Sequence, residues 1–296
     1  MADVVQALRQ AARMPSQEVL ALHHRHESFD QFALFQARLP GLLLQGERLE
    51  DVLAVTRALG ILEPFTGMHI APENIQIQGP NYRESMIANR LPSRHRAVLV
   101  VLEHLYGSLR QLGQMDVYLA EALTGFADWM QQQLGSQRLS VSEYQLNAEL
   151  NLAEIPHQDL CALSFPNGRF DLVLCNELFE HVQDLQMALR EIARVLKPQG
   201  RLVATCPMAF GQYETIVKAL HNPVSGRADL LTEPERHGDP VRPESGSLVY
   251  RIPGWQILDE LRQAGFSQAH IHHIASWKHG VLGSDLPGVL VIDAAR

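Results

Sequence analysis

The chain has 296 residues, of which 46% are hydrophobic and 20% are charged. These proportions are typical of a soluble globular protein with a sizeable core, and they exclude a largely disordered chain. The 25 Lys and Arg residues and the 33 Asp and Glu residues give a formal net charge of −8. Because binding to duplex nucleic acid needs a basic face, we predict no duplex nucleic acid among the partners.

Cysteine usage and hydropathy indicate the compartment. The three cysteines, Cys161, Cys175 and Cys206, have no C-x-x-C spacing, which argues against a compact thiolate zinc site. An odd number of cysteines, together with a start that lacks the features of a secretory leader, predicts a cytoplasmic protein. No run of about 18 apolar residues occurs, so we also predict no membrane partner.

The first third of the chain is dominated by helix-forming residues. Residues 1–95 carry apolar residues at helical spacing with prolines between them, which predicts an N-terminal helical region of several short helices. Residues 67–89 are predicted to form an irregular crossing, and residues 93–112 a longer helix. We expect the N-terminal helices to serve either as a lid or as the contact of a homodimer.

From residue 116 onward, short apolar segments alternate with amphipathic ones, which is typical of a parallel, doubly wound sheet. We predict an α/β domain over residues 96–296 with a Rossmann-like doubly wound seven-stranded sheet, whose last strand is commonly antiparallel in such sheets. A long segment over residues 208–253, rich in Pro, Gly, His and charge, is predicted to be a lid-like insertion. The candidate strands are 116–120, 139–143, 170–175, 201–206, 267–274 and 288–293, and the candidate helices are 126–134, 183–196 and 255–264.

The most informative segment runs from residue 170 to residue 207. Its start, FDLVLCNELFEHV, has the apolar run of a fully buried strand, followed by Asn176 and Glu177 at the strand's carboxyl end. Ligands of open α/β sheets bind at that edge. With the upstream stretch DLCALSFPNGRFDLV, this segment resembles class I S-adenosylmethionine-dependent methyltransferases, and the resemblance covers about residues 115–296.

The resemblance implies S-adenosylmethionine as the cofactor and assigns roles to particular residues. Asp159 would contact the adenine amino group, and Glu143 would bind the ribose hydroxyls, because a carboxylate accepts two hydrogen bonds from a diol. Asn176 and the turn at Glu121 would lie near the methionine moiety. The full set of cofactor-binding residues that we predict is Glu121, Ala122, Thr124, Glu143, Tyr144, Asp159, Leu160 and Asn176.

The chain departs from the family after the first strand. The family normally has an acidic-x-G-x-G-x-G loop, in which glycines let the backbone approach the cofactor. Here the sequence reads DVYLAEALTGF, with Glu121 and a lone Gly125. A narrower subgroup with an altered loop is more similar, because it shares the SEY, EHV and HGDP segments. The altered loop motivates an alternative function, a catalytically silent methyltransferase-fold protein that acts as a binding or regulatory partner.

A second constellation follows the buried strand. Glu177, Glu180 and His181 form an E-x-x-E-H pattern that places side chains about one helical turn apart. Ubiquinone-pathway O-methyltransferases resemble this segment and can bind a divalent metal there, a ligand set that is reasonable metal chemistry. His181 or Glu177 could instead be the catalytic base, or the pair Glu180–His181 could only cap a helix. We predict catalytic roles for His181 and Glu177 and no metal site.

The insertion supplies further candidates. Its polar side chains favour either a substrate lid or a weak metal site, and the alternative is a surface loop in which Gly-Asp-Pro forms a turn. We predict a methyltransferase that acts on O or N of a small-molecule substrate. The candidates in the insertion are His221, Glu233, Glu235, His237 and Asp239.

Overall fold

The computed structural model describes residues 23–146, 148–222 and 224–296. These residues form two compact units. Unit 1 contains residues 23–29, 33–111 and 271–291, and unit 2 contains residues 30–32, 112–270 and 292–296. The predicted helix over the first residues of the chain lies outside the described residues. The domain boundary near residue 95 stays a prediction.

Unit 1 contains most of the helices predicted before residue 112, together with short strands that the sequence did not indicate. Helix α4 has acidic residues in its first turn and buries Val52, Leu53 and Val55 against Ile61 and Met86. The elements of unit 1 in chain order are β1 (Arg25–Phe29), α3 (Phe32–Gly46), α4 (Leu49–Leu59), β2 (Ile61–Leu62), β3 (His69–Ile70), η1 (Pro72–Asn74), β4 (Ile75–Ile77), α5 (Tyr82–Ser85), β5 (Met86–Ala88), β6 (Leu91–Pro92), α6 (Ser93–Tyr106), α7 (Leu109–Leu112) and η2 (Trp277–His279).

Two expectations for unit 1 are wrong in detail. Residues 67–89 are not an irregular crossing, because β4, β5 and β6 form a small antiparallel sheet there. Strands of two or three residues are too short to produce a readable alternation. The helix over residues 93–112 is interrupted at Gly107, whose φ of 72° ends α6 and whose N–H donates to Glu103 O.

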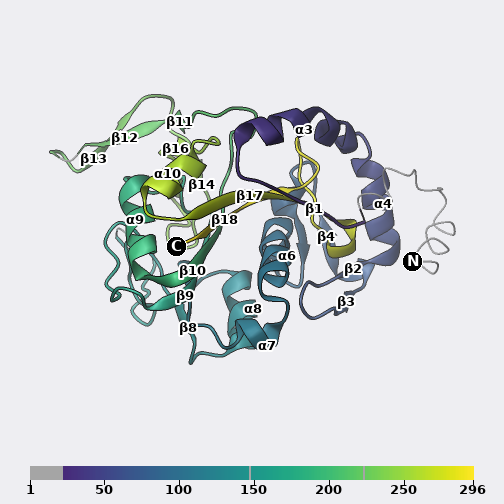
Figure 1. Ribbon diagram of the computed structural model, residues 1–296, viewed down its shortest axis with the longest axis horizontal. Helices are drawn as coiled ribbons and strands as arrows, with labels where there is room; N and C mark the ends of the chain where they lie inside the picture. The colour runs from purple at the N-terminus through teal and green to yellow at the C-terminus, as the bar shows by residue number, and fades with distance from the viewer. Residues whose placement is uncertain (1–22, 147, 223) are drawn as a thin grey trace. The chain divides into compact units, whose positions relative to one another are not determined.

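The main sheet has seven strands in the order β1-β17-β18-β10-β9-β7-β8 (Figure 1). This seven-stranded mixed sheet confirms the predicted α/β, Rossmann-like fold class. Strands β8, β7, β9 and β10 run parallel, and β18 runs antiparallel to β10, as the common variation predicts. The strands not yet given bounds are β7 (Val117–Leu119), β8 (Leu139–Val141), β9 (Phe170–Asn176), β10 (Leu196–Thr205), β17 (Gln268–Ala275) and β18 (Val289–Ala295).

Strand β10 begins five residues earlier than predicted. Leu196 already pairs with Phe170, and the register then shifts before Arg201. Gln199, with a φ of 67°, lies in this irregularity. Because the Pro-Gln-Gly sequence is typical of a helix end, it does not predict that the strand has already begun.

Three helices of unit 2 match the predicted ones. They are α8 (Gly125–Leu134), α9 (Leu185–Val195) and α10 (Ile257–Gln263), and α9 packs against α10. Side chains cap two of them, because Thr124 Oγ1 accepts from Ala127 N and Asp184 Oδ1 accepts from Met187 N. Among the residues that the structure describes, no helix has the length and apolar composition needed to cross a membrane.

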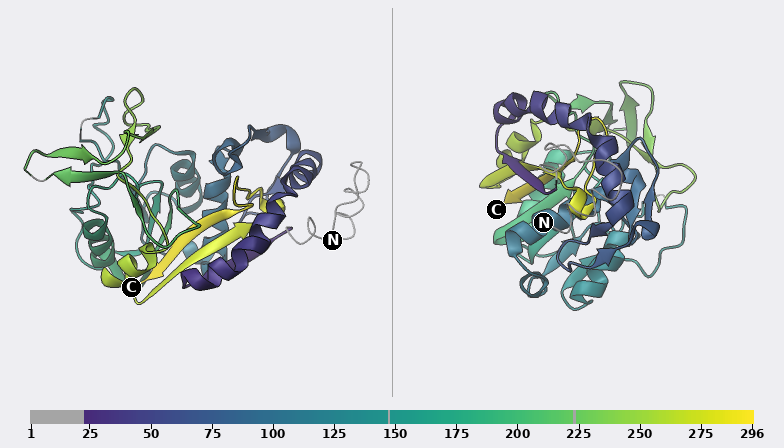
Figure 2. Two further views of the ribbon diagram at one scale, coloured as in Figure 1. Left: turned by 90° about the horizontal axis from the view of Figure 1, so that it is seen from above. Right: turned by 90° about the vertical axis from the view of Figure 1, so that its right-hand side faces the viewer.

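The predicted insertion is built from short antiparallel pairs. The β12–β13 hairpin extends away from the sheet of unit 2 (Figures 1 and 2). Another part of the insertion is held to the segment after β8, because both carboxylate oxygens of Glu149 accept backbone N–H groups, from Glu244 and Ser245. The strands are β11 (Ile216–Val217), β12 (Ala219–Asn222), β13 (Arg227–Leu230), β14 (Arg236–His237), β15 (Ser247–Leu248) and β16 (Arg251–Ile252).

Candidate active site

The carboxyl ends of β7 and β9 place two of the predicted residues in contact. Strands β7 and β9 are parallel neighbours, so their carboxyl ends share one edge of the sheet. Asn176 Nδ2 donates to Glu121 Oε1 over 2.8 Å, and Thr205 Oγ1 donates to Asn176 Oδ1 over 3.3 Å. All three side chains are buried. The predicted methionine end of the site is therefore a pre-formed polar network.

Glu143 lies just past β8 and holds the loop that replaces the glycine-rich one. Its Oε1 accepts N–H groups from Ala122 over 2.8 Å and from Leu123 over 2.9 Å. Burial raises the pKa of Glu143, and these two hydrogen bonds act in the opposite direction. The second oxygen, Oε2, takes part in neither bond. A loop without its usual glycines is thus fixed by a carboxylate instead.

Three further predicted residues lie along the edge that follows β8. The backbone of Glu143 pairs with residues 156–158, and the Tyr144 ring packs 5.5 Å from the His157 ring, measured between centroids. Asp159 Oδ1 accepts from Cys161 N over 2.8 Å, and both Asp159 and Leu160 are half-buried. Tyr144 is 38% exposed and Leu123 is 37% exposed, so neither side chain fills a buried cleft.

Thr124 has a structural task. Its hydroxyl accepts from Ala127 N over 3.1 Å and begins α8, which is the ordinary role of a helix N-cap.

Glu177 has an unusual backbone. Its φ is 54°, a left-handed conformation that non-glycine residues adopt rarely and that costs free energy. Its N–H still donates to Thr205 O over 2.8 Å. Residues held in such conformations cluster at functional sites, which agrees with the position of Glu177 directly after the buried strand.

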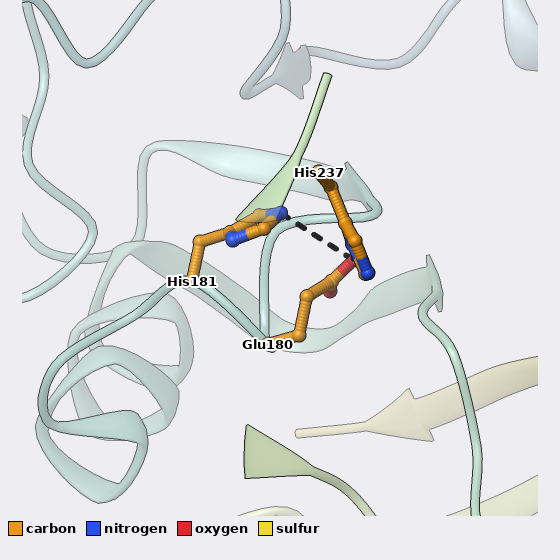
Figure 3. Close-up of side chains that lie close together, drawn as sticks. All are labelled: Glu180, His181 and His237. Atoms are coloured by element: carbon orange, nitrogen blue, oxygen red, sulfur yellow. Dashed lines mark ion pairs between the residues drawn. The ribbon is translucent and has the colours of Figure 1, made fainter. Parts of the chain in front are cut away.

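Glu180, His181 and His237 converge, although His237 is 56 positions further along the chain (Figure 3). Glu180 Oε1 lies 3.7 Å from His181 Nε2 and 3.7 Å from His237 Nδ1. Glu180 is completely buried, while both imidazoles are partly exposed. Burial raises the pKa of Glu180. The Glu180 carboxylate raises the pKa of His237, and Glu235 acts in the same direction. Glu180 and His181, predicted together in the E-x-x-E-H pattern, are joined here by His237 of the insertion.

The same part of the insertion contacts the predicted cofactor edge. Arg242 donates to Tyr144 O over 3.0 Å and lies over the Tyr144 ring at 5.6 Å. Asp239 accepts from Arg242 Nη1 over 2.7 Å and also from the hydroxyl of Ser247. No motif in the sequence marks Arg242, and Asp239 could belong either to a lid or to a turn. In the sequence, only the HGDP segment indicated a turn at this position. A turn motif does not show which strand ends the turn will contact.

Comparisons with known proteins agree with the fold. The methyltransferase-domain family matches residues 104–204. The uncharacterized methyltransferase YcgJ of Bacillus subtilis is 43% identical over 42 residues, which are 14% of this chain and 17% of that protein. The chain therefore spans only a small part of this curated relative's length.

Two solved structures illustrate the likeness. An S-adenosylmethionine-dependent methyltransferase of Mesorhizobium loti is 18% identical with a TM-score of 0.41, covering 64% of this chain and 95% of that one. The 1,6-didemethyltoxoflavin-N1-methyltransferase of Burkholderia thailandensis, solved with 1,6-didemethyltoxoflavin and S-adenosylhomocysteine, is 16% identical with a TM-score of 0.35, covering 75% and 94%. The matched segment is a methyltransferase domain, which supports S-adenosylmethionine as the cofactor.

Proposed function

We propose that this protein is a methyltransferase that transfers the methyl group of S-adenosylmethionine to an oxygen or nitrogen atom of a small molecule. The observation that carries the proposal is the carboxylate of Glu143, buried at the carboxyl end of β8 and fixed by the amides of Ala122 and Leu123. A carboxylate held in place with an oxygen to spare fits a ribose diol. The loop keeps its shape without the usual glycines, so the altered sequence is compatible with a cofactor.

The remaining predicted residues would complete the cofactor site. Asp159 has one oxygen in its bond to Cys161 N, which leaves the other for an adenine amino group. The buried pair of Glu121 and Asn176 offers polar atoms for the methionine end. Ala122, Tyr144 and Leu160 would supply the walls, and Thr124 would act through the start of α8.

The cofactor, when bound, supplies an electrophilic methyl group on a sulfonium. The chain's own residues would then align the acceptor atom and take its proton. His181 and Glu177 are the candidates for the base. His181 Nδ1 lies 2.8 Å from Leu248 O, and a carbonyl only accepts, so Nδ1 carries the proton and Nε2 holds the free electron pair of the neutral ring. The left-handed backbone of Glu177 turns this residue away from the strand direction.

A small-molecule acceptor fits the position of the insertion. Arg242 and Asp239 hold the insertion against Tyr144, where it would cover the cofactor edge and limit what can enter. The net charge of −8 argues in the same direction, against duplex nucleic acid as substrate. A cytoplasmic location belongs to the same proposal, as do N-terminal helices that serve either as a lid or as the contact of a homodimer.

One observation favours the second candidate, a silent protein of the same fold. Glu143 Oε1 already binds the loop amides, so the carboxylate has a structural use that needs no cofactor. In that case the edge of the sheet would serve as a surface for another protein.

Isothermal titration with S-adenosylmethionine and S-adenosylhomocysteine separates the two candidates. We expect the purified full chain to bind both, and Glu143→Gln to weaken binding roughly 10- to 100-fold, the usual loss for a hydrogen bond to a charged group. The amide oxygen of the variant can still accept from Ala122 and Leu123, which preserves the loop. Glu154→Gln, an exposed change in the same segment, is the matched control. A folded wild-type protein that gives no heat would contradict the methyltransferase and favour the silent protein.

A further inference from the structure

Glu180 is the least satisfied charged group among the described residues of unit 2. Its side chain is completely buried, and neither Oε1 nor Oε2 has a hydrogen-bond partner. Removing a carboxylate from water without hydrogen bonds or a paired charge costs several kcal/mol, so buried carboxylates are paired or bind metals. Such a group in a natural protein needs an explanation.

The hydrogen bonds of His237 and His181 fix which nitrogen of each ring faces Glu180. His181 donates from Nδ1 to Leu248 O over 2.8 Å, and His237 donates from Nε2 to Glu235 Oε1 over 3.1 Å. In the neutral rings, His181 Nε2 and His237 Nδ1 therefore carry electron pairs. Both nitrogens lie 3.7 Å from Glu180 Oε1, so three electron-rich atoms converge.

We propose that Glu180, His181 and His237 bind a divalent transition-metal ion of the zinc type. Two imidazole nitrogens and one carboxylate oxygen are a ligand set that such ions use in catalytic sites, where a fourth position stays open. The site goes beyond the methyl transfer proposed above, because neither the cofactor nor the acceptor is needed to form it.

The spacing of the ligand atoms fits this ion. The three ligand atoms lie within 4.8 Å of one another. Tetrahedral bonds of about 2.1 Å place two ligand atoms roughly 3.4 Å apart, so the two separations of 3.7 Å need only small rotations. The rings of His181 and His237 stand nearly perpendicular, at 87°, so that their nitrogens reach one point from different directions (Figure 3).

A second layer of contacts supports the same assignment. Ligating histidines usually donate their other N–H to a carboxylate or a backbone carbonyl, which fixes the tautomer and strengthens the ligand. Glu235 does this for His237 and is itself paired with Lys218, while Leu248 O does it for His181. Both arrangements come from the insertion, so the metal would fasten the insertion to the segment after β9.

The metal also sharpens the assignment of the base. When His181 Nε2 binds the ion, it no longer has a free electron pair for the acceptor's proton. Glu177 then remains as the base, and the open position of the ion could hold the acceptor's oxygen or nitrogen and lower its pKa. This last step alone rests on the proposed function.

Metal binding is tested on the full chain after treatment with a chelator, in the absence of S-adenosylmethionine. We expect titration with zinc chloride to show one bound ion and a raised melting temperature, and cobalt chloride to give the visible absorption of a low-coordinate site. His237→Ala and Glu180→Gln should each weaken binding at least roughly 100-fold, and Glu235→Gln roughly 10- to 100-fold. His221→Ala, an exposed histidine of the same insertion, should change nothing.

Circular dichroism of each variant shows whether it is folded, and Glu180→Gln preserves the shape of the side chain. The proposal is overturned if the folded wild-type chain binds neither zinc nor cobalt, which would mean that protons alone occupy the cluster. It is equally overturned if His237→Ala binds as tightly as the wild type. Failure to bind S-adenosylmethionine in the separate titration would leave the metal result intact, so the two proposals fail independently.

Discussion

Unit 1 and unit 2 each bury a charged side chain completely, Arg96 in the first and Glu180 in the second. The guanidinium of Arg96 donates to four backbone carbonyls, which belong to Met86, Leu91, His279 and Gly280. The carboxylate of Glu180 accepts no hydrogen bond from the residues that the structure describes. Burial lowers the pKa of Arg96 to about 9, which keeps it charged at neutral pH.

The difference separates a structural charge from a functional one. The chain itself supplies every contact that Arg96 needs, so Arg96 acts as a tie between α6 and the residues around η2. Glu180 lacks such partners, and its neighbours are two histidines whose electron pairs point toward it. A buried charge that the chain leaves unsatisfied indicates a binding partner from outside the chain.

The largest expected effect comes from removing the tie. Arg96→Met leaves four buried carbonyls without their donor, and we expect it to lower the free energy of unfolding by about 3–5 kcal/mol. Hydrogen exchange of α6 measures the loss in unit 1. Arg48→Met, an exposed change in the same unit, should stay within about 0.5 kcal/mol of the wild type. A similarly small loss for Arg96→Met would contradict the conclusion that Arg96 is a structural charge and Glu180 a functional one.

The sequence predicted most strands and helices of unit 2, whereas in unit 1 it predicted helices but not the short strands. The apolar run of β9 and the amphipathic spacing of α9 are long enough to be read directly. The strands between Ile61 and Pro92 are two or three residues long and depend on pairing with distant segments. Their backbone hydrogen bonds, and not their own side-chain pattern, define them.

Some residues of the candidate site could likewise be predicted from the sequence, and others could not. Glu143 and Asn176 could be named from the sequence because each directly follows a predicted strand, and parallel strands bring such residues to one edge. The approach of His237 to Glu180 had no local signal. It depends on how β14 and β15 pair within the insertion, which spacing along the chain cannot show. Glu143, whose carboxylate fixes the altered loop, was predicted only as a ligand residue. Its hydrogen bonds to Ala122 and Leu123 could not be predicted, because they depend on the fold.

Unit 1 contains a buried neutral histidine whose ring nitrogens lack hydrogen-bond partners among the described residues, which allows a comparison with the buried carboxylate of Glu180. His273 is completely buried, neither ring nitrogen has a hydrogen-bond partner within the described part of the chain, and burial lowers its pKa to about 4. The unfolded chain takes up its proton near pH 6.5, so stability is full above that pH and falls as the pH drops toward 4. The loss from this residue is about 2 kcal/mol at about pH 5.

We therefore expect His273→Leu to unfold at lower pH than the wild type in an acid titration followed by circular dichroism. His221→Gln, which changes an exposed histidine, should leave the acid midpoint in place. An unchanged midpoint in His273→Leu would show that other groups control acid unfolding.

Glu180→Gln should act in the opposite direction to Arg96→Met. At about pH 9, where an ordinary histidine is neutral, and with a chelator present, the variant removes a buried charge without partners. We expect the melting temperature to rise, corresponding to a gain of about 1–2 kcal/mol. Added zinc should reverse the order, because only the wild type gains from the ion. A loss of stability with chelator present would mean that the chain satisfies Glu180 by itself.

The smallest expected effect separates damage to the segment from damage to the site. Asp184 begins α9 three residues after His181, and its side chain accepts from Met187 N over 2.9 Å. Asp184→Ala should lower the free energy of unfolding by about 1 kcal/mol, the usual value of such a cap. Because Asp184 is not among the ligand atoms, zinc affinity should stay at the wild-type value. A drop in affinity as large as that of His237→Ala would show that the cluster depends on the order of the whole segment, and not on the three side chains that converge in it.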